Sequence, residues 1–136
     1  MKLKTKTRCG TRLVLDLARH QGKGSVQMHE ISMRLNISVK YLEQLIRPLK
    51  QAHLVTSTRG PKGGHMLAKN PEEVTLGEIT RLFEGTTGVV NCISNPEKCS
   101  IFDDCAVRSA WEKAGKALYA ELDSITIADL LAKKID

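Results

Sequence analysis

Hydrophobic residues recur every three or four positions in three segments near the start of the chain. This spacing places them on one face of a helix and predicts helices over residues 6–20, 28–35 and 39–51. Ser38 precedes the third segment, where its hydroxyl can accept a hydrogen bond from the first turn of the helix. Pro48 lies inside that segment, so we expect the helix to kink or to end early at the preceding residue.

The pattern changes after the third helix from helical spacing to strand composition. Residues 54–58 are rich in β-branched side chains, residues 59–64 form a turn of Gly and Pro, and residues 65–68 can return as a second strand. Two short helices joined by a tight turn and followed by a β-hairpin are typical of a winged helix-turn-helix. We therefore predict a winged helix-turn-helix DNA-binding domain over residues 1–70.

The second half of the chain, residues 71–136, returns to helical spacing. We expect a helix over 76–84, a cysteine-bearing loop over 89–103, a long helix over 104–122 and a last helix over 127–134. Thr75 and Glu78 have the spacing of a capping box at the first of these helices. The long helix carries an apolar stripe that includes Val107 and Trp111, which its own small domain cannot cover. The expected fold is mostly α with a small β-hairpin wing, and the long helix joins two copies into a homodimer.

Charge is distributed unevenly between the two halves. The chain has a net charge of +6, but residues 1–69 hold 14 Lys and Arg against 3 Asp and Glu, whereas residues 70–136 hold 7 against 12. A basic first half attached to an acidic second half indicates that the first half binds a polyanion. A basic surface that is merely solvated is the alternative explanation of the charge alone.

The chain offers no apolar run of about 18 residues that could cross a membrane. Its basic start resembles a signal peptide, but Arg8, Arg12 and Asp16 interrupt the apolar stretch that would have to follow. We therefore expect a cytoplasmic protein with no membrane partner. In that reducing compartment, clustered cysteines serve as metal ligands or redox-active thiols more often than as structural disulfides.

Three of the four cysteines, Cys92, Cys99 and Cys105, fall within fourteen residues. Three interpretations are open for this cluster. It could hold an iron–sulfur cluster, which thiolates suit. It could form a thiol–disulfide switch without metal, or it could bind structural zinc with a fourth ligand from elsewhere.

An enzyme is the competing class of function. The sequence shows no Ser/His/Asp set and no nucleotide-binding fingerprint, and the turn at 59–64 lacks the spacing of a phosphate-binding loop. A thiol oxidoreductase remains as a lesser alternative, but the usual Cys-x-x-Cys on a βαβ pattern is missing. We expect a regulator rather than an enzyme.

Several motifs carry a resemblance to a known family. They are Met-Lys-Leu at the start, residues 12–18, Ile-Ser-Val-Lys-Tyr-Leu-Glu-Gln-Leu over 37–45, Leu-Val-Thr-Ser-Thr-Arg-Gly-Pro-Lys-Gly-Gly over 54–64, Pro-Glu-Glu-Val-Thr-Leu-Gly-Glu-Ile over 71–79, and the three-cysteine cluster. With these motifs the chain resembles the Rrf-type winged helix-turn-helix transcription regulators of bacteria, the family of IscR and NsrR. The resemblance covers nearly the whole chain. It implies a homodimer that binds a palindromic operator in double-stranded promoter DNA.

The resemblance also implies site residues. Carried onto matching positions, the DNA-reading residues are Ser38, Lys40, Tyr41, Glu43 and Gln44 in the third helix and Arg59 and Lys62 in the hairpin turn. Many members hold an iron–sulfur cluster on three cysteines, which here are Cys92, Cys99 and Cys105. Such a cluster would be of the 2Fe–2S or the 4Fe–4S type, which the sequence does not decide, and it can be lost in protein prepared in air.

The chain departs from the family pattern at the cluster. Six residues separate Cys92 from Cys99 and five separate Cys99 from Cys105, where IscR-like and NsrR-like members have five and five. Arg108 stands where IscR-like members have a ligating His, and Arg8 stands where NsrR-like members have a ligating Asp; a guanidinium cannot donate a lone pair to iron. We hypothesise that Cys9 of the partner subunit completes the site. The alternative is that Cys9 is a small buried hydrophobic residue.

Overall fold

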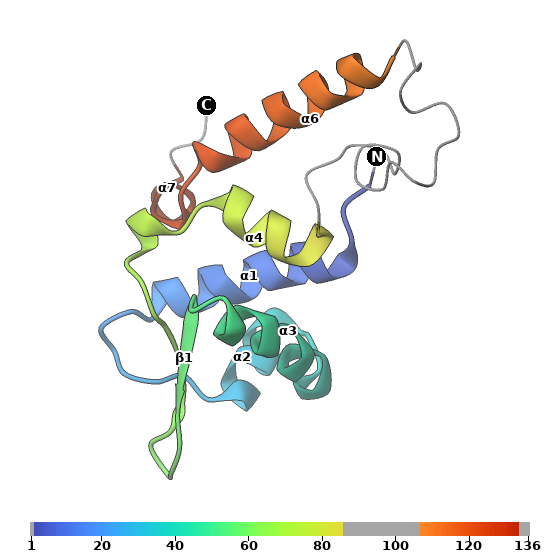
Figure 1. Ribbon diagram of the computed structural model, residues 1–136. Coiled ribbons are helices and arrows are strands. Elements are labelled where there is room, and N and C mark those ends of the chain that lie inside the picture. The colour runs from blue at the N-terminus through green and yellow to red at the C-terminus, as the bar shows by residue number, and fades with distance from the viewer. Residues whose placement is uncertain (1, 86–106, 134–136) are drawn as a thin grey trace.

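A computed structural model describes residues 2–85 and 107–133, in which a bundle of helices carries a projecting β-hairpin (Figure 1). The elements are α1 (Thr5–Arg19), α2 (Met28–Leu35), α3 (Val39–Gln51), β1 (Val55–Thr58), β2 (Gly64–Leu67), the 3-10 turn η1 (Pro71–Glu73), α4 (Leu76–Glu84), α6 (Arg108–Asp123) and α7 (Ile127–Ala132). The predicted fold class is confirmed. Each predicted helix or strand of the DNA-binding half is found within one or two residues of its expected bounds.

Helix α1 is the central element of the fold. It packs against α2, α3, β2, α4 and α7, and its apolar stripe is buried, with Leu13 and Val14 fully inaccessible to solvent. Ile31 of α2 and Leu45 of α3 close the same core from the other side. Elements from both halves of the chain therefore pack on α1, and the predicted boundary at residue 70 stays a prediction.

Helices α2 and α3 form the helix-turn-helix. Asn36 ends α2 in the left-handed conformation, with a φ of 56°, and Ser38 caps α3 by accepting a hydrogen bond from the backbone N–H of Tyr41 at 3.2 Å. Of the kink or early end that we expected at Pro48, the early end is wrong, because α3 continues to Gln51. The proline has no backbone N–H to donate, so the helix lacks one hydrogen bond there. Burial of neighbouring residues such as Leu49 stabilises the last turn.

The hairpin is the predicted wing. Strands β1 and β2 are antiparallel, with Val55 opposite Leu67 and Thr58 opposite Gly64. The base of the hairpin is attached to the core, since Val55 and Leu67 are both buried, whereas the turn that joins the strands projects into solvent (Figure 1).

Helix α4 differs in one respect from its predicted start. The Thr75 hydroxyl accepts from the Glu78 backbone N–H at 3.1 Å, as a capping box requires. The return bond from the Glu78 carboxylate is not formed among the described residues, because this side chain turns toward Lys69, with 3.9 Å between Nζ and Oε2. The complete capping box lies instead at α7, where Thr126 and Asp129 exchange two bonds of 3.0 Å.

The C-terminal helices pack beside α4. Helix α6 ends at Asp123, one residue beyond the expected end, and its expected start at residue 104 lies outside the described residues. Helix α7 ends at Ala132, two residues before the expected end, because Lys133 adopts a left-handed conformation with a φ of 56°. Among the described residues, no helix is long and apolar enough to cross a membrane.

Candidate DNA interface and sensor region

The predicted DNA-reading residues of α3 share its outer side. Ser38, Lys40, Glu43 and Gln44 are exposed, and Tyr41 is half-buried because its ring packs against the core. Capping occupies the hydroxyl of Ser38, so its role in the free protein is to start the helix. The other side of α3 is buried, which leaves this polar face as the part of the helix that is open to a partner.

The predicted wing residues Arg59 and Lys62 lie in the exposed turn between β1 and β2. Gly60 within the turn has a φ of 104°, a backbone conformation that other residues adopt at a cost. Two cations on a narrow, projecting hairpin suit a minor groove or a line of phosphates.

Residues 25–27, which precede α2, brace the wing. The Ser25 hydroxyl lies 2.8 Å from that of Thr58, and Gln27 Nε2 donates to the carbonyl of Pro61 at 3.3 Å. Between them, Val26 exchanges backbone hydrogen bonds of 2.9 and 2.8 Å with His65. The wing is therefore fixed to the first helix of the helix-turn-helix. Sequence reasoning missed this brace, since three residues are too few to show the period of a strand.

A glycine makes this close approach possible. A Cβ atom on Gly64 would stand 2.5 Å from the carbonyl oxygen of Val26, which is closer than real Cβ atoms come. Glycine is therefore needed at position 64, because a larger residue would collide with the backbone of Val26.

His65 lies on β2 opposite Ser57, near the turn of the wing. Its Nδ1 lies 2.7 Å from the Ser57 hydroxyl. Burial lowers the pKa of His65 below the usual 6.5, the positive charge of Lys50 lowers it further, and Glu43 opposes both. At neutral pH the ring is therefore uncharged and does not add to the basic surface.

The C-terminal part of α1 holds the helix-turn-helix in position. Asp16, buried on α1, accepts two hydrogen bonds from Arg34 of α2, at 2.9 Å from Nε and 2.8 Å from Nη2. The hydrogen bonds to the Asp16 carboxylate raise the pKa of Arg34 above its ordinary value. One turn earlier on α1, Arg12 donates to the carbonyl of Leu35 at 2.8 Å, just before the turn between α2 and α3.

The sensor region is described only at its borders, because Cys92, Cys99 and Cys105 lie outside the described residues. On the N-terminal border, the Glu84 carboxylate accepts from the Lys4 backbone N–H at 2.7 Å and from the Thr7 hydroxyl. Gly10 faces the ring of Phe83, with no room for a Cβ between them. The residues that lead into the cysteine loop are thus attached to the N-terminal part of α1.

Cys9 lies on this same part of α1. It is a free thiol, half-buried, and packed at the edge of the hydrophobic core. This position fits the small hydrophobic role that the sequence left open, and its partial exposure also leaves the sulfur within reach of a ligand or a partner subunit. The neighbours of Cys9 on α1, Gly10 and Thr7, contact Phe83 and Glu84 at the C-terminal end of α4.

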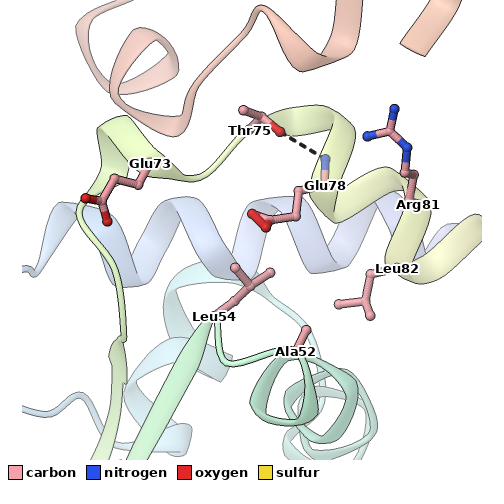
Figure 2. A pocket seen from close by; sticks show the side chains of 7 residues that line it. All are labelled: Ala52, Leu54, Glu73, Thr75, Glu78, Arg81 and Leu82. Carbon is pink, nitrogen blue, oxygen red and sulfur yellow. Dashed lines mark hydrogen bonds between the residues drawn. The ribbon is translucent and has the colours of Figure 1, made fainter. Parts of the chain in front are cut away.

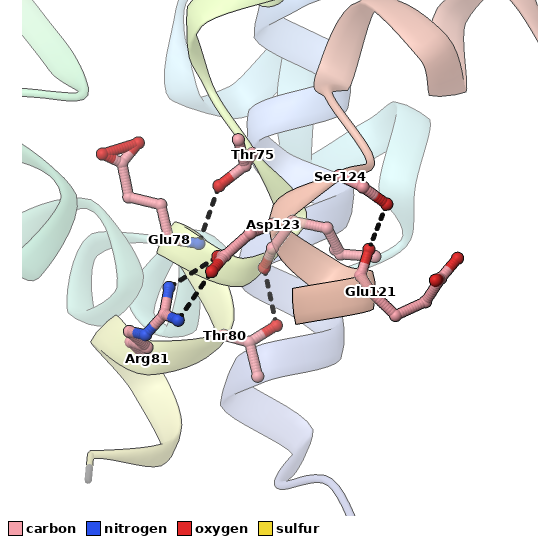
Figure 3. A network of polar contacts seen from close by, with 8 residues as sticks. Thr75, Glu78, Thr80, Arg81, Glu121, Asp123 and Ser124 are labelled. Atoms are coloured by element: carbon pink, nitrogen blue, oxygen red, sulfur yellow. Dashed lines mark hydrogen bonds and ion pairs between the residues drawn. The ribbon is translucent and has the colours of Figure 1, made fainter. Parts of the chain in front are cut away.

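Helices α4 and α6, which come before and after the cysteine-bearing segment in the sequence, are joined by an ion pair between Arg81 and Asp123. Arg81 donates two hydrogen bonds to Asp123, of 2.6 and 2.8 Å (Figure 3). The Arg81 guanidinium also lies 4.6 Å from the centre of the Tyr119 ring. These bonds lower the pKa of Asp123 below its usual 3.8, against a smaller opposing effect of burial. Burial raises the pKa of Tyr119 above 10.0, with Arg81 opposing the change.

Comparison with known proteins identifies the architecture. The profile of the Rrf2 family, described as an iron-dependent transcriptional regulator, matches residues 3–133. The chain belongs to the Rrf2 family of transcriptional regulators. It is 40% identical to protein rrf2 of Nitratidesulfovibrio vulgaris, over 96% of this chain and 87% of that protein.

Solved structures of Rrf2 proteins have the same fold. IscR of T. potens superposes with a TM-score of 0.80 and 38% identity, covering 99% of this chain and 89% of that one. CymR of B. subtilis, whose structure is described as that of the global cysteine regulator, superposes with a TM-score of 0.79 and 36% identity, covering 100% and 99%. The relatives therefore include both an IscR and a CymR, the second of which is described as a cysteine regulator.

Proposed function

We propose that this Rrf2 regulator binds a palindromic promoter site as a homodimer and that an iron–sulfur cluster on Cys92, Cys99 and Cys105 controls the binding. Membership of the Rrf2 family over almost the full chain is the observation that carries the proposal. The geometry of the described residues supports DNA reading and dimerisation, whereas sensing is argued from the family and from the chemistry of the cysteines.

DNA reading is assigned to the exposed face of α3 and to the wing. Glu43 can accept from the N4 amino group of cytosine, and Gln44 can pair with adenine through its amide. Arg59 at the wing would enter an A·T-rich minor groove, whereas Lys40 and Lys62 would contact phosphates and make binding salt-dependent. The brace at residues 25–27 supports this assignment, because a wing fixed to α2 enters its groove in a set orientation relative to α3.

Dimerisation is assigned to α6. The described residues of α6 that are buried are Gly115 and Tyr119, and α6 packs against α4. The predicted apolar stripe lies elsewhere, and its first members remain open to solvent, with Val107 52% and Trp111 44% exposed. A large aromatic side chain left half-exposed on a long helix is suited to pack against a second copy of the same helix.

Sensing is assigned to the thiolates. Cysteine sulfur is the usual ligand of iron–sulfur clusters, so the chemistry of the donor set fits the group, which would supply a redox- or iron-dependent change of state. The three proposed ligands are Cys92, Cys99 and Cys105. Cys9 of the partner subunit is our candidate for the fourth, since Arg108, at the position of a ligating His in IscR-like members, is a guanidinium and has no lone pair to offer.

Transmission to the DNA follows the borders of the loop. The entry to the loop is attached to α1 through Glu84 and Phe83, and α1 holds α2 through Asp16 and Arg34. A loop that is ordered in one state and altered in the other would therefore shift the population of helix-turn-helix arrangements that fit the operator.

Substitution of Cys9 tests the ligand set. Protein is prepared anaerobically as wild type, as Cys9→Ser and as Cys92→Ser, and its visible absorption and iron content are recorded. We expect both variants to lose most of the cluster absorption. Unchanged absorption in Cys9→Ser would remove Cys9 from the ligand set, while loss in Cys92→Ser would still support the cluster.

A thiol switch without metal is the second candidate, and the relationship to CymR favours it. One of the related structures, 34% identical, is described as an oxidised form of CymR from Staphylococcus aureus. If anaerobic protein contains no iron, and if a thiol oxidant changes promoter binding in wild type but not in Cys99→Ser, the switch replaces the cluster in this account.

A further inference from the structure

Val39, the first residue of α3, differs from the apolar stripe of that helix in its exposure. The stripe itself, formed by Leu42, Leu45, Ile46 and Leu49, is buried. Val39 precedes Leu42 by three residues and Ile46 by seven, which is the spacing of the stripe, yet it is 37% exposed. Among the described residues, Val39 belongs neither to the hydrophobic core nor to the partly buried side chains packed against it. Packing within the chain therefore does not explain an apolar residue at this position.

The opposite end of the helix shows apolar residues that do have partners in the chain. Ala52, which follows α3, and Leu54 line one pocket together with Leu82 of α4 (Figure 2). Leu54 is buried, and Ala52 and Leu82 both pack against the hydrophobic core. The start of α3 is therefore the end at which an apolar side chain is left open to a partner.

The neighbours of Val39 belong to the face of α3 that we propose reads DNA. Ser38 fixes the start of the helix by accepting from the Tyr41 backbone N–H, and Lys40 is exposed. Glu43 follows Val39 by four residues, which places the two Cβ atoms about 5–6 Å apart on one side of the helix. The first turn of α3 carries no acidic side chain that would repel phosphates. The first residues of a recognition helix are also those that contact base edges in the major groove.

We propose that Val39 recognises a thymine of the operator through the 5-methyl group of the base. This methyl group is the apolar feature that distinguishes thymine in the major groove, and its contact with Val39 removes apolar surface of both partners from water. Base pairs are stacked about 3.4 Å apart, so the thymine lies one or two base pairs from the base that Glu43 contacts. The inference rests on the proposed DNA reading by α3, to whose hydrogen bonds it adds an apolar contact.

Deoxyuridine tests this contact, because its base differs from thymine only in lacking the 5-methyl group. The probe is a fluorescent duplex selected from a random-sequence library by the full-length wild-type protein. Each thymine of one half-site is replaced in turn, and the dissociation constant is measured by fluorescence anisotropy at constant salt concentration. We expect one replacement to weaken binding of the wild type by about fourfold, as loss of one buried methyl group implies. The same replacement should change the affinity of Val39→Ser by less than about twofold, because the apolar partner of the methyl group is absent.

Three further variants separate the contact from other effects. Val39→Ile keeps the apolar surface, and Met33→Ser changes an apolar residue of α2 that is 82% exposed, so both should retain the deoxyuridine effect. A deoxyuridine effect that is the same in the wild type and in Val39→Ser at every thymine would overturn the proposal. If Glu43→Ala then still loses affinity, the Val39 contact alone is refuted. If no duplex is enriched in the selection, DNA reading by α3 is itself refuted, and this inference falls with it.

Discussion

The bidentate pair between Asp16 and Arg34 gives the sharpest stability prediction, because its two members are buried to different degrees. The Asp16 side chain is 3% exposed and that of Arg34 is 35% exposed. Replacing Arg34 by Met keeps most of the apolar stem but leaves the Asp16 carboxylate buried without its partner. Removing one partner of a buried pair costs about 3–5 kcal/mol. Since water can reach the Arg34 side, we expect a loss at the lower end, about 3 kcal/mol.

The reverse substitution should cost less. Asp16→Asn removes the charge but keeps one acceptor for Arg34, whose guanidinium can turn to solvent, so we expect a loss of about 1–2 kcal/mol. The double variant should lose about as much unfolding free energy as Arg34→Met alone, and less than the sum of the two single losses, because each substitution removes the same interaction.

Urea unfolding followed by circular dichroism measures these values, at one protein concentration for all variants because the proposed dimerisation would add to stability. Arg19→Met is the matched control, since Arg19 is an exposed arginine on α1, the helix that carries Asp16. A loss for Asp16→Asn that exceeds the loss for Arg34→Met would refute the reasoning from burial. A loss for Arg34→Met no larger than that of the control would show that the pair is not formed.

Three further predictions concern the wing, the α4–α6 contact and the dimer. Gly64→Ala places a methyl group against the Val26 carbonyl, so operator affinity should fall by about tenfold or more while the far-ultraviolet spectrum stays unchanged; unaltered affinity would show that the brace does not orient the wing. The pKa of Asp123 is lowered in the folded protein, so the ionised carboxylate stabilises the fold above the usual pKa of 3.8, and this stabilisation is lost as pH falls through the lower folded pKa. Asp123→Asn should therefore flatten this part of the acid-unfolding curve. An unchanged curve would contradict the pairing with Arg81. Trp111→Glu should shift the protein from dimer to monomer in sedimentation analysis, whereas a variant that remains dimeric would place the interface elsewhere.

Sequence periodicity predicted the DNA-binding half well because its physical signals are local. The buried stripe of α3, the cap at Ser38 and the Gly-rich turn of the wing each depend on neighbours a few residues apart. Pro48 is the exception. Its local effect predicted an early helix end, but burial of Leu49 in the core outweighed the lost hydrogen bond, and only the tertiary structure shows that burial.

The contacts between halves could not be predicted in the same way. Glu84 binds the start of α1 from 80 residues away in the sequence, and Arg81 pairs with Asp123 across 42 residues. Glu78 has the spacing of a capping residue, yet its carboxylate pairs with Lys69 instead of returning to the start of the helix. Such pairings depend on how α1, α4 and α6 pack, which no short-range pattern encodes.

The proposed ligand set, Cys92, Cys99, Cys105 and Cys9, stays a prediction, since the first three lie outside the described residues. The resemblance to Rrf regulators supplied the iron–sulfur hypothesis, whereas the residues alone left a thiol switch and zinc open. The structure adds that Cys9 lies on the part of α1 that contacts the entry to the loop.

The most direct test of the central claim is one paired measurement on anaerobically purified protein. Iron and acid-labile sulfide are quantified with the visible spectrum, and promoter binding is then measured before and after removal of the cluster. We predict a coloured, iron-containing dimer whose affinity for its operator changes when the cluster is removed, and a Cys92→Ser variant that is colourless and insensitive to the treatment. A colourless, iron-free protein, or one whose promoter binding is identical with and without the cluster, would contradict the account.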